Sequence, residues 1–114
     1  KKCDFIRLWP SEIQLQGWYV RLVENGYQKP HIHPTGWLSG VIYLETVNAE
    51  NTDAGAIELS LHGYALPILR DNVPKKIHRP RNGDIILFPS SCFHRTIPFR
   101  EKSERCVIAF DVMG

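Results

Sequence analysis

Two histidines separated by one residue, His31 and His33, lie near the start of the stretch KPHIHPTGWLSGVIYL, residues 29–44. Alternate residues of a β-strand project from the same face, so this spacing predicts two imidazoles close enough to hold one metal ion. A third histidine, His94, lies at the edge of an apolar, strand-like run in GDIILFPSSCFHRTIP. Neutral imidazole is a borderline ligand that suits iron, zinc, copper or nickel. The three positions therefore predict a mononuclear metal site with two neighbouring ligands and one distant ligand.

A binding group for an acidic ligand is predicted at Arg105, eleven residues after His94 in the stretch RCVIAFD. An arginine buried among apolar residues is costly without an anionic partner, and its planar guanidinium pairs bidentately with a carboxylate. Tyr43 falls nominally on the face of the histidine pair and could donate a phenol hydrogen bond to the same carboxylate. The alternatives are an exposed arginine paired with Glu101 or Glu104, and a tyrosine that only packs in the core.

Aromatic residues are candidates for the mouth of a site built in this way. We expect Trp18, Trp37 and Tyr64, with the irregular segment 62–82, to lie over the metal. Core packing is the alternative for each of them, and it suits Trp37 best. No further catalytic side chain is predicted beyond the metal ligands.

The elements that must position these residues are short strands. Hardly any window keeps the apolar period of a helix, and short alternating or apolar runs recur between turn signals such as Asn82-Gly83-Asp84. We expect an all-β double-stranded β-helix, a jelly-roll or cupin-like barrel with little helix and eight or nine strands. The first expected strand is an edge strand that could pair two copies into a homodimer. The second half of the next strand is expected to be central and covered on both faces. The strands are expected at 5–9, 13–23, 29–33, 37–45, 56–61, 76–78, 85–88, 93–99 and 105–112.

The composition is that of one globular domain, residues 1–114, with 43% hydrophobic and 23% charged residues. A net charge of +2 is too small to favour nucleic acid as a partner. The three cysteines show no CxxC spacing, which favours reduced thiols and a cytoplasmic location. No apolar run reaches the roughly 18 residues of a membrane span. Because the chain opens on Lys1, it is expected to be a trimmed protein or one domain of a longer one.

Three ordered motifs resemble a known enzyme family. HIHPTGWLSGVIYL, NGDIILFPSSCFHRTIP and RCVIAFD are similar to a bacterial and phage group of the Fe(II)/2-oxoglutarate-dependent oxygenase superfamily, from about Trp18 to Asp111. The resemblance implies a double-stranded β-helix with Fe(II) held by His31, His33 and His94, and with 2-oxoglutarate and O₂ as cosubstrates. It also implies a dioxygenase of the hydroxylase type, in which Arg105 binds the distal carboxylate of 2-oxoglutarate. The prime substrate is not indicated.

Departures from the superfamily pattern leave two other readings open. The residue two after the first histidine is usually a carboxylate, and here it is His33; Val107 stands where many members have a hydroxyl residue. A cupin-type three-histidine metalloprotein that does not use 2-oxoglutarate is the first alternative, although Trp37 and Leu38 stand where its glutamate should fall. The second alternative is a non-catalytic β-barrel binding module that keeps a vestigial site.

Overall fold

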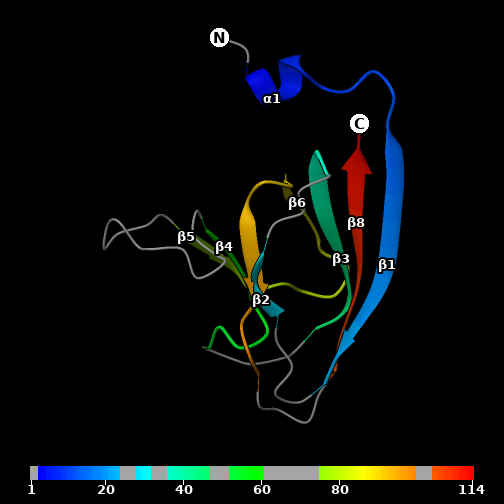
Figure 1. Ribbon diagram of the computed structural model, residues 1–114. Helices are drawn as coiled ribbons and strands as arrows, with labels where there is room; N and C mark the ends of the chain where they lie inside the picture. The colour runs from blue at the N-terminus through cyan, green and yellow to red at the C-terminus, as the bar shows by residue number, and fades with distance from the viewer. Residues whose placement is uncertain (1–2, 24–27, 32–35, 47–51, 61–74, 100–103) are drawn as a thin grey trace.

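The computed structural model describes residues 3–23, 28–31, 36–46, 52–60, 75–99 and 104–114 (Figure 1). Eight strands form two four-stranded sheets, with the orders β1-β8-β3-β6 and β2-β7-β4-β5, and all of the recorded pairings are antiparallel. This is the double-stranded β-helix that the sequence predicts. The strands are β1 Gln14–Leu22, β2 Gln28–His31, β3 Leu38–Glu45, β4 Ile57–Ser60, β5 Lys75–His78, β6 Ile85–Pro89, β7 Phe93–Thr96 and β8 Arg105–Met113.

The predicted edge strand at residues 5–9 is wrong, because this segment contains the short helix α1, Asp4–Arg7 (Figure 1). Backbone N–H groups of Ile6 and Arg7 donate to the carbonyl oxygen of Cys3, and the Arg7 side chain lies 2.9 Å from the Asp4 carboxylate. An acidic first turn and a basic last turn suit the dipole of a helix. These local contacts favour a helix here, although the apolar residues of the segment 5–9 had predicted a strand.

The prediction of a central second strand is also wrong. The strand β1 lies at the edge of its sheet, and among the described strands it pairs with β8 alone, from Gln14 opposite Met113 to Leu22 opposite Arg105. Leu15 and Tyr19 on its outer face are 71% and 59% exposed. Apolar residues on both faces of a strand therefore did not mean that both faces are covered.

The core lies between the inner faces of the two sheets. Alternation along each strand selects these positions: Val107 on β8 is 2% exposed, whereas the next residue, Ile108, is 37% exposed. Burial of such side chains is the main favourable contribution to folding. The buried hydrophobic cluster comprises Val41, Tyr43, Ile57, Phe88 and Val107.

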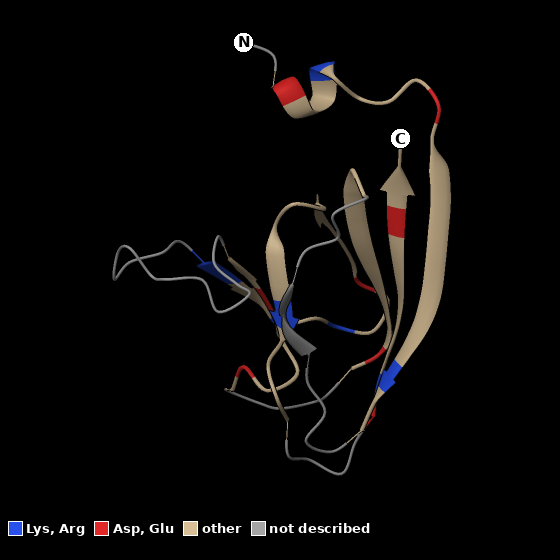
Figure 2. Ribbon diagram, viewed as in Figure 1, with Lys and Arg blue, Asp and Glu red and all other residues tan. Residues whose placement is uncertain are grey.

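Acidic and basic positions are scattered over the described ribbon (Figure 2). Several pair with each other, including Arg79 with Asp53 at 2.7 Å and Arg95 with Glu58 at 3.0 Å. No helix in the described part of the chain is long and apolar enough to cross a membrane.

Candidate metal and carboxylate site

The strands β2 and β7 pair in an antiparallel ladder, and each contributes one histidine position to it. In the register of these strands, His31 is the direct partner of His94. Opposite residues of an antiparallel pair have their Cβ atoms about 5 Å apart. The register thus brings together two of the three predicted ligand positions, although they are separated by 63 residues of sequence. His33 and the side chain of His31 lie outside the described residues.

The imidazole of His94 is held in one orientation. It is 7% exposed, packs 4.7 Å from the ring of Phe88, and places Nδ1 3.2 Å from the carbonyl oxygen of Cys92. A carbonyl oxygen only accepts, so Nδ1 carries the proton and donates it. In the neutral imidazole this leaves Nε2 as the nitrogen that can ligate a metal.

Arg105 is buried, and two of its guanidinium nitrogens meet no partner in the described part of the chain. Its side chain is 3% exposed, and its Nε and Nη1 have no hydrogen-bond partner among the residues described. Its Cζ lies 5.3 Å from the centre of the Tyr43 ring, and the fully buried Tyr43 hydroxyl also lacks a partner in this part of the structure. Glu104, one of the predicted partners of Arg105, pairs with Arg21 instead. Unsatisfied buried donors of this kind are rare and costly, so they indicate a missing anionic ligand.

Burial raises the pKa of the Tyr43 phenol, and the positive charge of Arg105 lowers it by less. Tyr43 therefore stays protonated at neutral pH and can donate a hydrogen bond. A guanidinium and a neighbouring phenol are both donors that suit a carboxylate.

One cavity between the sheets connects the two groups. His94 and Arg105 both line it, together with Trp18, Thr96 and Val107. The His94 imidazole and the Arg105 guanidinium thus line the same cavity, whose other lining residues are mostly apolar. These residues fit a metal ion together with a small dicarboxylate that spans both groups.

The predicted mouth residues are placed differently from one another. Trp18 lines the cavity and is 37% exposed. Trp37 is stacked on Phe5 at 5.3 Å, and its buried indole Nε1 has no partner within the described ranges. Tyr64 and most of the segment 62–82 lie outside the described residues. Trp18 is therefore the mouth residue with a geometric link to His94 and Arg105.

A buried polar cluster was missed by the sequence reasoning. The Ser39 hydroxyl donates to the Asp111 carboxylate at 2.7 Å and lies 2.8 Å from the Ser90 hydroxyl. All three side chains are at most 5% exposed, and Ser39 also lines the cavity. The available signal was the occurrence of small or acidic residues at inward positions of apolar strands. The cluster joins β3, β8 and the end of β6.

A family model described as "Putative 2OG-Fe(II) oxygenase" matches residues 16–111. This chain belongs to that family. The matched region includes His94, Arg105 and Tyr43, and it agrees with the resemblance seen in the three sequence motifs. The family's description names Fe(II) and 2-oxoglutarate (2OG), which are the cofactor and cosubstrate of that family.

Solved structures of other oxygenases share the fold. An oxidoreductase of the 2OG-Fe(II) oxygenase family from Burkholderia pseudomallei has a TM-score of 0.67 and 18% identity, over 90% of this chain and 45% of that one. A prolyl-4-hydroxylase from Pseudomonas putida has a TM-score of 0.66 and 15% identity, over 87% and 51% of the two chains. This oxygenase chain therefore spans about half the length of those proteins. No curated protein matches the sequence.

A cupin domain from Bordetella pertussis is also similar, with a TM-score of 0.53 and 13% identity over 90% of this chain and 82% of that one. At such identities the superpositions establish the double-stranded β-helix alone. The family match, rather than the shape of the barrel, places the chain among the oxygenases.

Proposed function

We propose that this chain is the catalytic domain of a non-haem Fe(II)- and 2-oxoglutarate-dependent dioxygenase that hydroxylates a prime substrate. The observation that carries the proposal is the buried Arg105, whose Nε and Nη1 lack a partner among the described residues and which lines the same cavity as His94. A dicarboxylic cosubstrate needs a cation at one end and a metal at the other. A metal-binding protein without such a cosubstrate has no use for that arginine.

Each residue has a role in this proposal. His31, His33 and His94 hold the metal, and Arg105 and Tyr43 donate hydrogen bonds to the distal carboxylate of 2-oxoglutarate. When bound, Fe(II) with 2-oxoglutarate and O₂ supplies the oxidant for hydroxylation. The apolar cavity walls exclude water from that chemistry, and Trp18 lies where a prime substrate would enter, with Trp37 and Tyr64 as the other predicted mouth residues.

Related folds support the use of this cosubstrate. HygX from Streptomyces hygroscopicus, with a TM-score of 0.63 and 12% identity over 89% of this chain and 57% of that one, has nickel and 2-oxoglutarate bound. One of these proteins is a prolyl-4-hydroxylase and HygX has hygromycin B bound, so the shared barrel does not select a prime substrate for this chain. A cytoplasmic location and a homodimer also remain predictions.

The test is an anaerobic titration of the protein with Fe(II) and then with 2-oxoglutarate, followed by visible absorption. A weak charge-transfer band that requires both additions is expected. Arg105→Met should weaken 2-oxoglutarate binding on the order of 100-fold, because the distal carboxylate of 2-oxoglutarate loses its partner in the cavity. Fe(II) binding should stay intact. Arg79→Met is the matched control, because Arg79 is exposed and pairs with Asp53.

The alternatives predict other results of the same titration. Metal binding without the band would favour the cupin-type metalloprotein. A band that Arg105→Met leaves unchanged would contradict the role of Arg105. No metal binding at all would favour a non-catalytic barrel.

A further inference from the structure

The ladder between β3 and β8 contains one extra residue. It is regular from Leu38 opposite Val112 to Tyr43 opposite Val107, and it then shifts so that Glu45 lies opposite Cys106. Leu44 is the residue without a partner. This is a β-bulge, in which one strand carries two residues against one on its neighbour.

An uninterrupted ladder would place a carboxylate beside the cosubstrate arginine. Continued from Tyr43 opposite Val107, the regular register would pair Glu45 directly with Arg105. Glu45 would also share the inner face with Tyr43, because residues two apart on a strand project from the same side. Directly opposed side chains of opposite charge lie within reach of each other, so Glu45 would neutralise Arg105.

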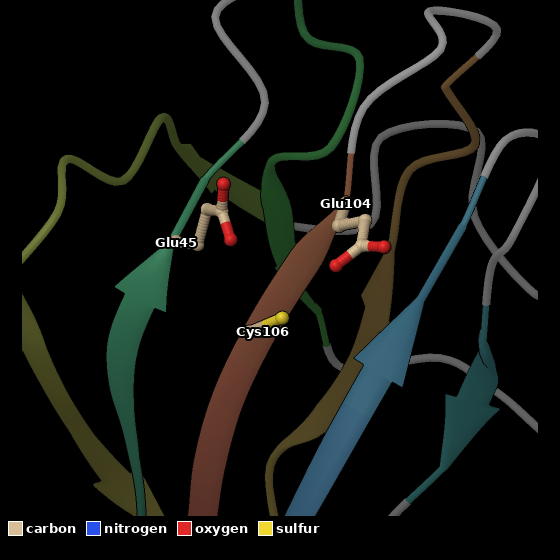
Figure 3. Close-up of side chains that lie close together, drawn as sticks. All are labelled: Glu45, Glu104 and Cys106. Atoms are coloured by element: carbon tan, nitrogen blue, oxygen red, sulfur yellow. The ribbon is translucent and has the colours of Figure 1, made fainter.

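The bulge sends this carboxylate to the outer surface. Glu45 is exposed, and one of its oxygens lies within 4.8 Å of a Glu104 oxygen and of the Cys106 sulfur (Figure 3). Glu104, the immediate neighbour of Arg105 in sequence, pairs with Arg21. Both nearby carboxylates are thus turned away from Arg105.

Contacts from a distant turn hold the bulge. The Thr46 backbone N–H and hydroxyl donate to Oδ1 of Asn82 at 2.9 and 3.0 Å. The carbonyl oxygen of Tyr43 accepts the Gly83 N–H at 2.7 Å, and Gly83 has the positive φ of 90° that this turn requires. The backbone on both sides of Leu44 is therefore anchored to the turn before β6.

We propose that the bulge at Leu44 keeps Arg105 available for an external carboxylate by excluding Glu45 from the inner face. Leu44 is a positioning residue in this role, since it acts through the register and touches no ligand. The inference rests on the proposed function, because the external carboxylate is that of 2-oxoglutarate. It explains why Arg105 would pair with the carboxylate of 2-oxoglutarate rather than with the side chain of Glu45.

The first test removes the extra residue. Deletion of Leu44 should restore the regular register and weaken 2-oxoglutarate binding at least about 30-fold, measured by anaerobic calorimetry on Mn(II)-loaded protein. The same deletion combined with Glu45→Gln should recover most of the affinity, because the blocking charge is gone. Equal affinity of the deletion variant and the unaltered protein would overturn the inference, as would a folded double variant that binds as weakly as the deletion alone.

A second pair of variants tests the principle without changing the register. Leu22 is the partner of Arg105 on β1, so Leu22→Glu introduces a carboxylate opposite the guanidinium, and Leu22→Gln is its uncharged control. Only Leu22→Glu should lower 2-oxoglutarate affinity. If the two variants bind equally well, an internal carboxylate does not block the site, and the inference fails even where the Leu44 deletion does not fold.

A readout without ligand separates this inference from the proposed function. In nitrogen-15 NMR spectra, exchange of the Arg105 Nε proton with water should slow in Leu22→Glu and in the Leu44 deletion, and not in their glutamine-containing controls. If the unaltered protein fails to bind 2-oxoglutarate, the proposed function is wrong. The Arg105 signal then still decides whether the bulge separates the two charges, and an unchanged signal in both acidic variants would contradict it.

Discussion

At the scale of single residues, the site is electrostatically incomplete in the isolated chain. Arg105 lines the cavity, and its Nε and Nη1 and the neighbouring Tyr43 hydroxyl meet no hydrogen-bond partner among the described residues. Burying such groups costs free energy that folding elsewhere must offset. Binding of a carboxylate ligand that accepts these hydrogen bonds should therefore stabilise the fold, because a ligand that binds only the folded state shifts the folding equilibrium by mass action.

Tyr43→Phe should have effects of opposite sign on stability and on binding. Removing an unsatisfied buried hydroxyl should raise the free energy of unfolding without ligand by about 1 kcal/mol, because that group no longer loses its water. The affinity for 2-oxoglutarate should fall about tenfold through loss of a hydrogen bond to a charged group. Thermal unfolding and calorimetry measure the two effects. Tyr19→Phe, at an exposed tyrosine, is the control, and loss of stability in Tyr43→Phe would contradict the expectation.

At the scale of elements, the buried polar cluster fixes the ends of three strands of one sheet. Ser39→Ala leaves Asp111 and Ser90 without the hydroxyl that joins them and should lower the free energy of unfolding by about 1–3 kcal/mol. Chemical denaturation measures this loss. Ser91→Ala changes an exposed serine next to the cluster and should cost less than about 0.5 kcal/mol, so equal losses would argue against the cluster as the cause.

The turn before β6 is a second element whose geometry can be tested. Gly83 has a φ of 90°, and a Cβ added there would meet nothing within 4 Å. Gly83→Ala should therefore destabilise the protein by about 1–2 kcal/mol through backbone strain alone. Gly17 on β1 lacks a positive φ and has room for a Cβ, so Gly17→Ala is the control. Unfolding curves in which the two variants are equally stable would rule out strain at Gly83.

At the scale of the whole molecule, acid stability should depend on the ion pair that joins β4 to β7. The Arg95 guanidinium donates to both oxygens of Glu58 and lowers the pKa of that carboxyl below its ordinary 4.5. Because the unfolded chain then binds the proton first, the pair stabilises the fold above pH 4.5, and this contribution is lost as the pH falls through the lowered pKa.

Glu58→Gln should remove up to about 1 kcal/mol of stability at neutral pH and reduce the loss of stability below pH 4.5. Denaturation curves measured at several pH values test this expectation. Asp53→Asn breaks the more exposed pair with Arg79 and should change both quantities less. An unaltered acid dependence in Glu58→Gln would show that other carboxylates dominate it.

Much of this arrangement could be predicted from the sequence. Alternation in the apolar runs gave the strands, and the motif spacing singled out His94, Arg105 and Tyr43, which the structure places around one cavity or beside it. The roles of these residues stay predictions. Helix α1 and the edge position of β1 were missed, because local ion pairing and the choice of neighbouring strands leave no periodic signal. The bulge at Leu44 depends on contacts between Thr46 and Asn82, and alternation alone would place Glu45 on the wrong face.

The unpaired Arg105 has a consequence for protein engineering. A mutant library screened for heat resistance without cosubstrate would enrich apolar replacements of Arg105, since an uncompensated buried charge is a liability in the empty barrel. The selected variants would be more stable to heat and would no longer bind 2-oxoglutarate. Selection for stability should therefore be made with a saturating dicarboxylate present. The bound acid then neutralises the guanidinium, and Arg105 is retained.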